Sequence, residues 1–299
     1  MTRSKPSPPP RLAADAHKGE AGRVLCLAGS ESMPGAAILC ARAAQRAGAG
    51  LVAVGCLDSV LLGALPVAAP EAVLVDLTEK FEHNGRVHGG AAERLLARAP
   101  HAVLLGPGLG DDARTRSLLS LALATLEVPL VLDADALNAL DGEPERLKAT
   151  RVPIVLTPHP GEAERLLHRS VPREAEARAS AARELAERSG AIVCLKGHGT
   201  VVAEPGGELW VNATGNAGMA TAGAGDVLSG ILVAYLALVR SLSDSAWTPL
   251  AAARAAVLVH GLAGDLAAER LGERALIASD LVDELAAAQR RFEEGAHAS

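Results

Sequence analysis

Residues Asn212–Leu238 read NATGNAGMATAGAGDVLSGILVAYLAL. Glycines and other small residues precede Asp226, and the apolar run that follows it predicts a long buried helix. Glycines let a ligand approach the backbone closely, and the unpaired N–H groups at a helix start favour an anion. A carboxylate at such a turn is placed to take a proton from an attacking hydroxyl. The stretch therefore predicts phosphoryl transfer from a nucleotide, with Asp226 as the base.

The rest of the chain alternates between short apolar segments and longer helical ones. Strands are predicted at residues 23–28, 51–56, 72–77, 102–105, 129–132, 153–156 and 192–195, with a hairpin at 201–203 and 208–211. Helices are predicted at 36–47, 89–98, 111–126, from near 161, and at 172–189, 226–239, 249–269 and 279–292. The strands are apolar throughout, which is typical of parallel sheets that helices cover on both faces.

This pattern predicts an α/β protein, a three-layer α/β/α sandwich with a mostly parallel central sheet. The expected domain covers residues 16–292. We expect a disordered N-terminal tail at 1–15, where Pro, Ser and Lys are frequent, and a C-terminal tail at 293–299.

The charge, hydropathy and cysteines of the sequence indicate which partners and which location to expect. The net charge of −6 gives no indication of nucleic-acid binding, and no unbroken apolar run of about 18 residues indicates a membrane span. The four cysteines show no CxxC spacing and lie in apolar segments. We therefore expect reduced, buried thiols and a cytoplasmic location.

Polar or glycine-rich motifs follow several predicted strands, at the sheet edge where ligands bind. Gly106–Gly110 (GPGLG) is either a tight turn or a ligand-binding loop, and it matches neither the GxGxxG fingerprint nor a Walker A loop. Asp133 and Asp135 either cap a helix, bind a metal or orient a polar group. Lys196–Thr200 (KGHGT) offers a cation and a flexible backbone, which suit a nucleotide phosphate or ribose.

The stretch Thr157–Glu162 (TPHPGE) is more specific. Two prolines stiffen the turn and direct His159 outward, with a solvated loop histidine as the simpler alternative. Glu162 either favours a helix dipole or holds a hydrated Mg²⁺ beside phosphates, and no direct metal ligands are predicted. His260 is expected to be buried with its hydrogen bonds satisfied. No GxSxG element occurs, which argues against a serine hydrolase.

Seven motifs occur in order along the chain: HKGEAGRV, AGSESMPGAA, GPGLG, LDADALN, TPHPGEAERLL, KGHGT and NATGNAGMATAGAGDVLSGI. Together they resemble the ADP-dependent NAD(P)H-hydrate dehydratases, which have a ribokinase-like fold, over residues 16–285. The resemblance implies a repair reaction on NAD(P)HX, the hydrated form of NADH or NADPH. ADP would drive dehydration of its S form, giving the reduced cofactor, AMP and phosphate.

The resemblance also implies roles for single residues. Ala36, Gly108 and His159 would contact NAD(P)HX, and Asp226 would touch its reacting hydroxyl. The residues expected to bind the adenine nucleotide are Lys196, Gly197, His198, Gly199, Thr200 and Gly225. Mg²⁺ is expected with the nucleotide. Ala224 departs from the Ser or Thr frequent in the family, but the backbone N–H is kept.

Two further expectations concern partners. Many relatives carry an N-terminal epimerase domain, which the short predicted tail does not accommodate, so the resemblance implies a stand-alone dehydratase that works with a separate NAD(P)HX epimerase. Relatives are often tetramers, so a homotetramer is expected.

Phosphorylation of the ring hydroxyl would convert a poor leaving group into phosphate, which the ring nitrogen can expel. We expect the N–H groups of Gly223, Ala224 and Gly225 to stabilise the transferred phosphoryl group. The helix dipole should keep Asp226 ionised, a weak base that acts by position. The alternatives are a small-alcohol or vitamin-precursor kinase of the same fold, which typically carries Asn in place of His159, and a nucleotide-binding regulatory protein without catalysis.

Overall fold

A computed structural model describes residues 6–242, 244 and 246–297 of the protein. Within these residues, nine strands form one sheet in the order β3-β2-β1-β4-β5-β6-β7-β8-β9. The strands are β1 Arg23–Leu27, β2 Leu51–Cys56, β3 Val73–Asp76, β4 Ala102–Leu105, β5 Leu130–Leu132, β6 Ile154–Leu156, β7 Ile192–Leu195, β8 Val201–Ala203 and β9 Trp210–Val211. Strands β1 to β7 pair in parallel, and β8 and β9 extend the sheet antiparallel. The mostly parallel sheet is confirmed.

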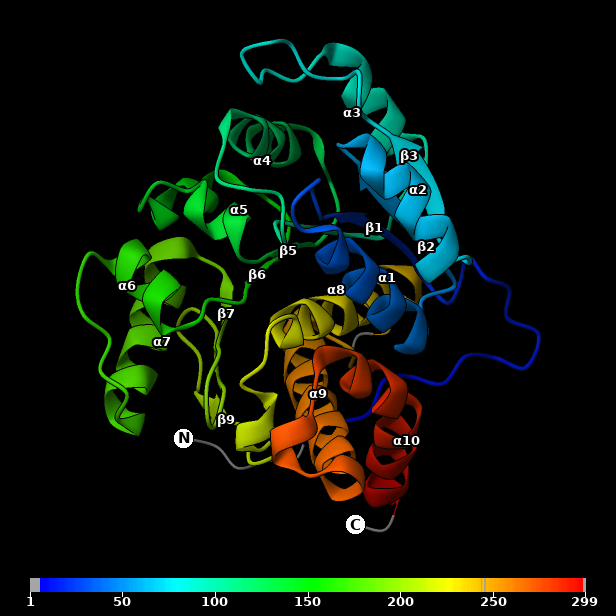
Figure 1. Ribbon diagram of the computed structural model, residues 1–299. Helices are drawn as coiled ribbons and strands as arrows, with labels where there is room; N and C mark the ends of the chain where they lie inside the picture. Colours follow the sequence, from blue (N-terminus) through cyan, green and yellow to red (C-terminus); the bar gives the residue numbers. More distant parts are fainter. Residues whose placement is uncertain (1–5, 243, 245, 298–299) are drawn as a thin grey trace.

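Helices cover both faces of this sheet (Figure 1). One layer contains α1 Pro34–Arg46, α2 Ser59–Ala68, α8 Ala224–Leu242, α9 Pro249–Leu271 and α10 Ala278–His297. The other contains α3 Gly89–Leu96, α4 Ala113–Thr125, α5 Asp135–Asn138, α6 Pro160–Leu167 and α7 Ala175–Ser189. Along β1, Val24 and Cys26 face the first layer, while Leu25 and Leu27 face the second. The predicted three-layer sandwich is therefore confirmed.

The sequence analysis missed α2, because two of its residues disfavour a helix. Gly63 and Pro66 lie inside it, and both residue types are unfavourable in a helix interior. Leu61 and Leu65, one turn apart, are fully buried. Their burial in the core stabilises a helix that propensity alone does not predict.

The ends of the chain differ in part from the predicted tails. Helix α10 continues to His297, so residues 293–297 of the predicted C-terminal tail are helical. Phe292 is 3% exposed and anchors the last turns of α10 to the core, and residues 298–299 lie outside the described residues. At the other end, residues 6–15 form no helix or strand and 1–5 lie outside the described residues, so disorder there stays a prediction.

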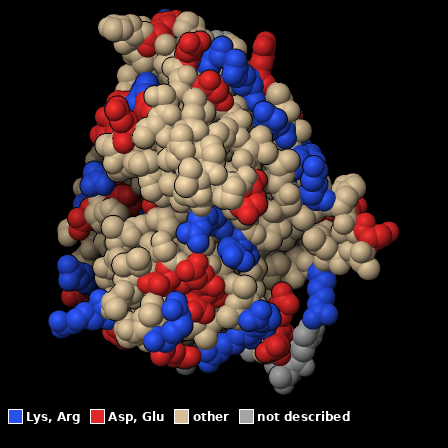
Figure 2. All heavy atoms as spheres, turned by 45° about the vertical axis from the view of Figure 1, so that its right-hand side comes forward, with Lys and Arg blue, Asp and Glu red and all other residues tan. Residues whose placement is uncertain are grey.

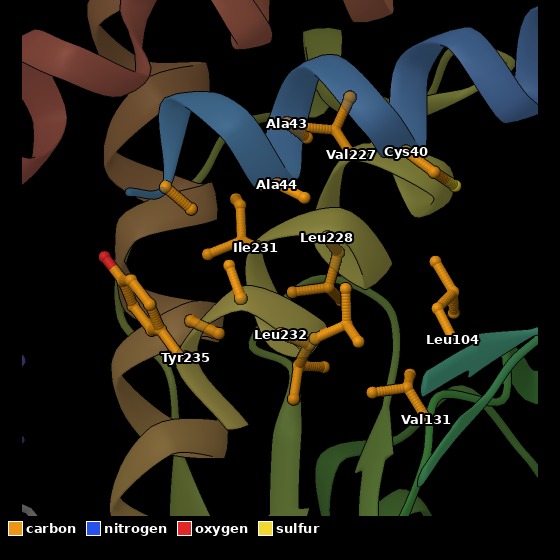
Figure 3. Close-up of a cluster of buried hydrophobic side chains, with 14 of the residues drawn as sticks. Cys40, Ala43, Ala44, Leu104, Val131, Val227, Leu228, Ile231, Leu232 and Tyr235 are labelled. Carbon is orange, nitrogen blue, oxygen red and sulfur yellow. The ribbon is translucent and has the colours of Figure 1, made fainter. Parts of the chain in front are cut away.

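Helix α8, the apolar half of Asn212–Leu238, lies between α1 and the sheet (Figure 3). Its buried side chains face small residues of α1 on one side and strand residues on the other; Figure 3 labels Cys40, Ala43 and Ala44 of α1, Val227, Leu228, Ile231, Leu232 and Tyr235 of α8, and Leu104 and Val131 of the strands. Small residues on α1 let the two helix backbones approach closely. This contact fixes the position of the α8 N-terminus relative to the sheet.

Helices α8 and α9 are the two helices of the described chain long and apolar enough to cross a membrane. Inside this fold, 67% of the apolar window of α8 and 61% of that of α9 are buried. Their apolar surface is thus covered by packing within the layer, as in core helices. The expectation of no membrane span stays a prediction.

We predict that Gly230→Ala destabilises the protein, although alanine usually favours a helix. A Cβ at Gly230 would lie 2.5 Å from the backbone oxygen of Cys40 and 2.7 Å from the Cβ of Ala43. Overpacking of this kind costs about 1–3 kcal/mol of unfolding free energy, which thermal or denaturant unfolding will measure.

The matched control is Gly63→Ala in α2, where a Cβ would meet no described atom within 4 Å. This change should stabilise the protein by up to about 1 kcal/mol. If Gly230→Ala stabilises the protein as much as Gly63→Ala does, the result would contradict the close packing of α1 against α8 at Gly230.

Candidate active site

The loops after the parallel strands and the first turn of α8 meet at the carboxyl edge of the sheet. A Cβ on Gly225 would lie 3.4 Å from Lys196 Nζ and 4.0 Å from Asp133 Oδ2. Three segments far apart in the sequence are therefore in contact here. Their side chains form one cluster of charged groups.

Asp133 lies at the centre of this cluster and is 1% exposed. Its Oδ1 accepts hydrogen bonds from Lys196 Nζ at 2.7 Å and from the Ala134 N–H at 2.9 Å. Its Oδ2 accepts one from Ser229 Oγ of α8, also at 2.7 Å. A buried carboxylate is tolerated when it is paired and hydrogen-bonded in this way. Of the three interpretations open for Asp133, the structure supports orientation of a polar group, namely the Lys196 ammonium.

Asp135 fixes the glycine-rich turn after β4. Its Oδ2 accepts the N–H of Gly110 at 2.8 Å, and no side chain caps α5. Gly108 has φ +64°, and a Cβ there would lie 2.7 Å from the Cβ of Ala36. The structure thus places the two predicted substrate residues Ala36 and Gly108 side by side, with glycine needed for that approach.

Asp226 lies in the first turn of α8. Burial and, to a smaller extent, the charge of Asp133 raise the pKa of its carboxyl group to about 7, although Lys196 partly opposes the shift. The expectation that the helix dipole keeps Asp226 an ionised, weak base is therefore wrong, because burial and the neighbouring carboxylate outweigh the dipole. A base with a pKa near neutral pH accepts a proton much more readily.

The N–H groups around Asp226 offer an anion site. Among the described residues, the N–H groups of Gly223, Gly225 and Asp226 itself donate no hydrogen bond. The Ala224 N–H differs, since it lies 3.4 Å from the Thr221 oxygen. Three free donors therefore surround the acidic side chain, and the sequence analysis missed the one on Asp226.

His260 of α9 contacts the first residue of α8. Its Nε2 lies 2.8 Å from the Ala224 oxygen, and burial lowers its pKa to about 4. A neutral imidazole that donates to this carbonyl holds the peptide between Ala224 and Gly225 in place. His260 is half-buried and has one hydrogen-bonded ring nitrogen among the described contacts, so the prediction of a buried, satisfied histidine is met only in part.

A cavity of about 620 Å³ opens beside this turn. Its walls contain all the residues predicted to bind the adenine nucleotide: Lys196, Gly197, His198, Gly199, Thr200 and Gly225. His159, predicted on the substrate side, lines the same cavity and has a 51% exposed side chain. The cavity therefore brings His159 together with the residues predicted to bind the nucleotide, whereas Ala36, Gly108 and Asp226 do not line it.

The sequence analysis missed residues that form or support the wall of this cavity. Asn212 anchors the wall by donating to the Thr214 and Val257 oxygens at 3.1 and 3.2 Å. Asp265 of α9 accepts the Gly215 N–H at 2.9 Å and the Asn216 amide at 3.1 Å. The polar NATGN stretch could have indicated Asn212, whereas Asp265 in the mostly apolar sequence of α9 gives no such signal.

His159 and Glu162 form a reciprocal cap at the start of α6. The His159 N–H donates to Glu162 Oε2 at 2.7 Å, and the Glu162 N–H donates to His159 Nδ1 at 3.3 Å. His159 is thus a helix cap as well as a cavity residue, rather than only a solvated loop side chain. Burial raises the pKa of Glu162, whose Oε2 also lies 3.8 Å from Lys196 Nζ.

These contacts limit how a metal could bind. The described residues include no group of three or more His, Cys, Asp or Glu side chains that could hold an ion. Asp133 is fully hydrogen-bonded, and Glu162 caps a helix. The described donor set therefore offers no cage for a metal, and the expectation that Glu162 holds a hydrated Mg²⁺ beside phosphates stays a prediction.

Comparison with known proteins shows the family to which the chain belongs. The sequence model described as NAD(P)H-hydrate dehydratase matches residues 24–287. The chain belongs to the NAD(P)H-hydrate dehydratase family. A bifunctional NAD(P)H-hydrate repair enzyme of Moorella thermoacetica is 42% identical over 287 residues, covering 95% of this chain and 52% of that protein. The chain thus spans about half the length of the curated relatives of this kind.

Relatives of the family with matching length are known. An ADP-dependent (S)-NAD(P)H-hydrate dehydratase of Bacillus subtilis is 34% identical over 284 residues, with 95% of both chains covered. A crystal structure of a B. subtilis ADP/ATP-dependent NAD(P)H-hydrate dehydratase, co-crystallised with ATP/Mg²⁺, superposes with a TM-score of 0.80 at 33% identity, covering 96% and 95% of the two chains. A ribokinase-like superfamily protein of Enterococcus faecalis gives 0.77 at 27% identity, covering 95% and 92%. The ribokinase-like fold is confirmed.

We predict that Asp226 of this NAD(P)H-hydrate dehydratase family member titrates near pH 7, against a usual value of 3.8. Carboxyl-carbon NMR of protein labelled at aspartate will measure the midpoint, with Asp226→Asn assigning the signal. Asp133→Asn should lower the midpoint, because it removes a neighbouring negative charge that favours the protonated form.

The control is Asp135→Asn, which should shift the midpoint less, since Asp135 contributes least to the raised pKa. A midpoint near 4 in the wild-type protein, or no response to Asp133→Asn, would contradict the electrostatic account of the site.

Proposed function

We propose that this chain catalyses the ADP-dependent dehydration of (6S)-NADHX and (6S)-NADPHX, yielding NADH or NADPH, AMP and phosphate. The observation that carries the proposal is the position of Asp226. A Cβ on Gly223 would lie 3.9 Å from Asp226 Oδ2 and 2.5 Å from Leu39 of α1, the helix that carries Ala36, while the adjacent Gly225 borders the nucleotide cavity. These positions support the proposal that Asp226, a proton acceptor with a pKa of about 7, acts between the two ligands.

The reaction follows from these positions. Asp226 accepts the proton of the ring hydroxyl, and the hydroxyl oxygen forms a bond to the β-phosphorus of ADP as the bond from that phosphorus to AMP breaks. The free N–H groups of Gly223, Gly225 and Asp226 stabilise charge on the phosphoryl oxygens. The ring nitrogen then pushes out phosphate as the C–O bond breaks, and loss of a proton from the neighbouring carbon restores the dihydropyridine.

Lys196 and Mg²⁺ would share the charge of the phosphates. Burial lowers the pKa of Lys196, but Asp133 and Glu162 outweigh it, so the pKa is raised and the ammonium stays charged. We propose Mg²⁺ as the cofactor, held by the nucleotide with Glu162 reaching it through water. Bound there, Mg²⁺ would supply further neutralisation of the phosphates.

We also propose a homotetramer and a cytoplasmic location. Helix α2 contains no charged residue, and Val67 and Val60 on it are 84% and 38% exposed. Figure 2, which brings the α1 and α2 side forward, shows a broad area free of Lys, Arg, Asp and Glu. Such a surface suits contacts between copies. The four free, buried cysteines support a reducing compartment. Functional pairing with an NAD(P)HX epimerase is proposed because one epimer is the substrate.

The test is incubation of the purified chain with (6S)-NADHX and ADP. We expect the absorbance of the reduced nicotinamide to return with equal amounts of AMP and inorganic phosphate. Asp226→Asn, which keeps the shape of the side chain, should bind ADP normally and lose about 100-fold or more of the turnover. Calorimetry with ADP provides the binding control.

Other outcomes separate the alternatives. A stable phosphorylated alcohol without phosphate release would indicate a kinase. ADP binding without any turnover of (6S)-NADHX, with ADP or with ATP, would indicate a binding protein. Near-wild-type turnover by Asp226→Asn would overturn its assignment as the base.

A further inference from the structure

Arg178 of α7 lies buried behind the loop Lys196–Thr200, and it is 6% exposed. Its guanidinium donates hydrogen bonds to three backbone carbonyls: from Nη1 to His198, and from Nη2 to Gly199 at 3.0 Å and to Leu195 at 3.4 Å. Nε is buried without a partner in the described protein. All its acceptors are neutral.

No carboxylate compensates this cation. Within the part of the chain that the structure describes, Arg178 forms no ion pair. Burial alone lowers its pKa, with no opposing contribution from an acid. An arginine stays protonated in proteins, and a buried charge without a counterion is unfavourable. The fold thus maintains a positive charge directly behind the nucleotide cavity.

The loop in front of Arg178 presents donors rather than acceptors. The Gly197 oxygen accepts from Thr200 Oγ1 at 3.2 Å, and the His198 and Gly199 oxygens accept from Arg178. The N–H groups of Gly197, His198 and Gly199 donate no hydrogen bond to any described residue. Successive free N–H groups in such a loop attract anions.

Glycine is required where the loop touches the guanidinium. Gly197 has φ +140°, and a Cβ there would lie 3.0 Å from Arg178 Nη2 and 3.1 Å from Cζ. Gly199 has φ +64°. The backbone at Gly197 and at Gly199 therefore adopts conformations that favour glycine, and these place the loop carbonyls against the Arg178 guanidinium.

We propose that Arg178 is a positioning residue that converts this loop into a binding site for the phosphates of a nucleoside diphosphate. It draws the loop carbonyls inward, leaves the N–H groups free for the ligand, and contributes a positive charge without touching the nucleotide. The inference rests on the proposed function, since it deepens the nucleotide side of that site.

The test compares Arg178→Gln and Arg178→Lys with the wild-type protein. Arg183→Gln is the matched control, because Arg183 is an exposed arginine on the same helix. Calorimetry measures the Kd of ADP and of uncharged adenosine for each protein. We expect Arg178→Gln to weaken ADP at least 10-fold and adenosine less than 3-fold, Arg178→Lys to weaken ADP by an intermediate factor, and Arg183→Gln to change neither. In the assay, the KM for ADP should rise while the KM for (6S)-NADHX stays constant.

Unchanged ADP affinity in Arg178→Gln overturns the inference, and so does an equal loss for ADP and adenosine, which would indicate only a structural role. Thermal unfolding without ligand shows whether each variant folds. If Arg178→Gln does not fold, the test uses Arg178→Lys instead. A larger loss of affinity for ADP than for adenosine then supports the inference, and an equal loss for both overturns it. Wild-type binding of ADP without formation of NADH would overturn the proposed function and leave this inference standing. Wild-type protein that binds no ADP would overturn both.

Discussion

The site depends on the ion pair between Lys196 Nζ and Asp133 Oδ1, 2.7 Å apart. Asp133 follows β5 and Lys196 follows β7, so the pair links two strand ends on either side of β6. The second carboxylate oxygen of Asp133 accepts Ser229 Oγ, which joins α8 to the same group. One buried carboxylate therefore sets the distance between the sheet edge and the helix that carries Asp226.

The same pair balances the charges of the cluster. Asp133, Glu162 and Asp226 are neighbours, and a single ammonium lies among them. Lys196 keeps Asp133 paired, while burial and the charge of Asp133 raise the pKa of Asp226 to about 7. The structure thus produces a carboxylate that is ready to exchange a proton, beside N–H groups that favour a phosphate. Under the proposed function, this arrangement would let a ribokinase-like site turn a hydroxyl into a leaving group.

Much of this could be predicted from the sequence, because parallel strands buried on both faces have continuous apolar runs and their loops gather at one edge. The residues GPGLG, KGHGT and GAGD accordingly lie together. Arg178 and Asp265 could not be predicted, since they act through tertiary contacts made from helices without a local motif. Ser229 lies in the quoted GAGDVLSGI motif, but its contact with Asp133 depends on the folded chain. The pKa of Asp226 was predicted wrongly for the same reason: the helix dipole is a local property, whereas burial and the proximity of Asp133 depend on the folded chain. Helix α2 forms through burial of Leu61 and Leu65 despite its glycine and proline.

The most direct test of the central claim follows the oxygen of the ring hydroxyl. (6S)-NADHX that carries ¹⁸O in this hydroxyl is incubated with ADP and the purified chain in unlabelled water, and the released phosphate is analysed by mass spectrometry. Transfer of the β-phosphoryl group to the hydroxyl predicts one ¹⁸O atom in each phosphate released and none in AMP. Unlabelled phosphate, with the ¹⁸O recovered in water, would contradict the account, because the hydroxyl would then have left without being phosphorylated.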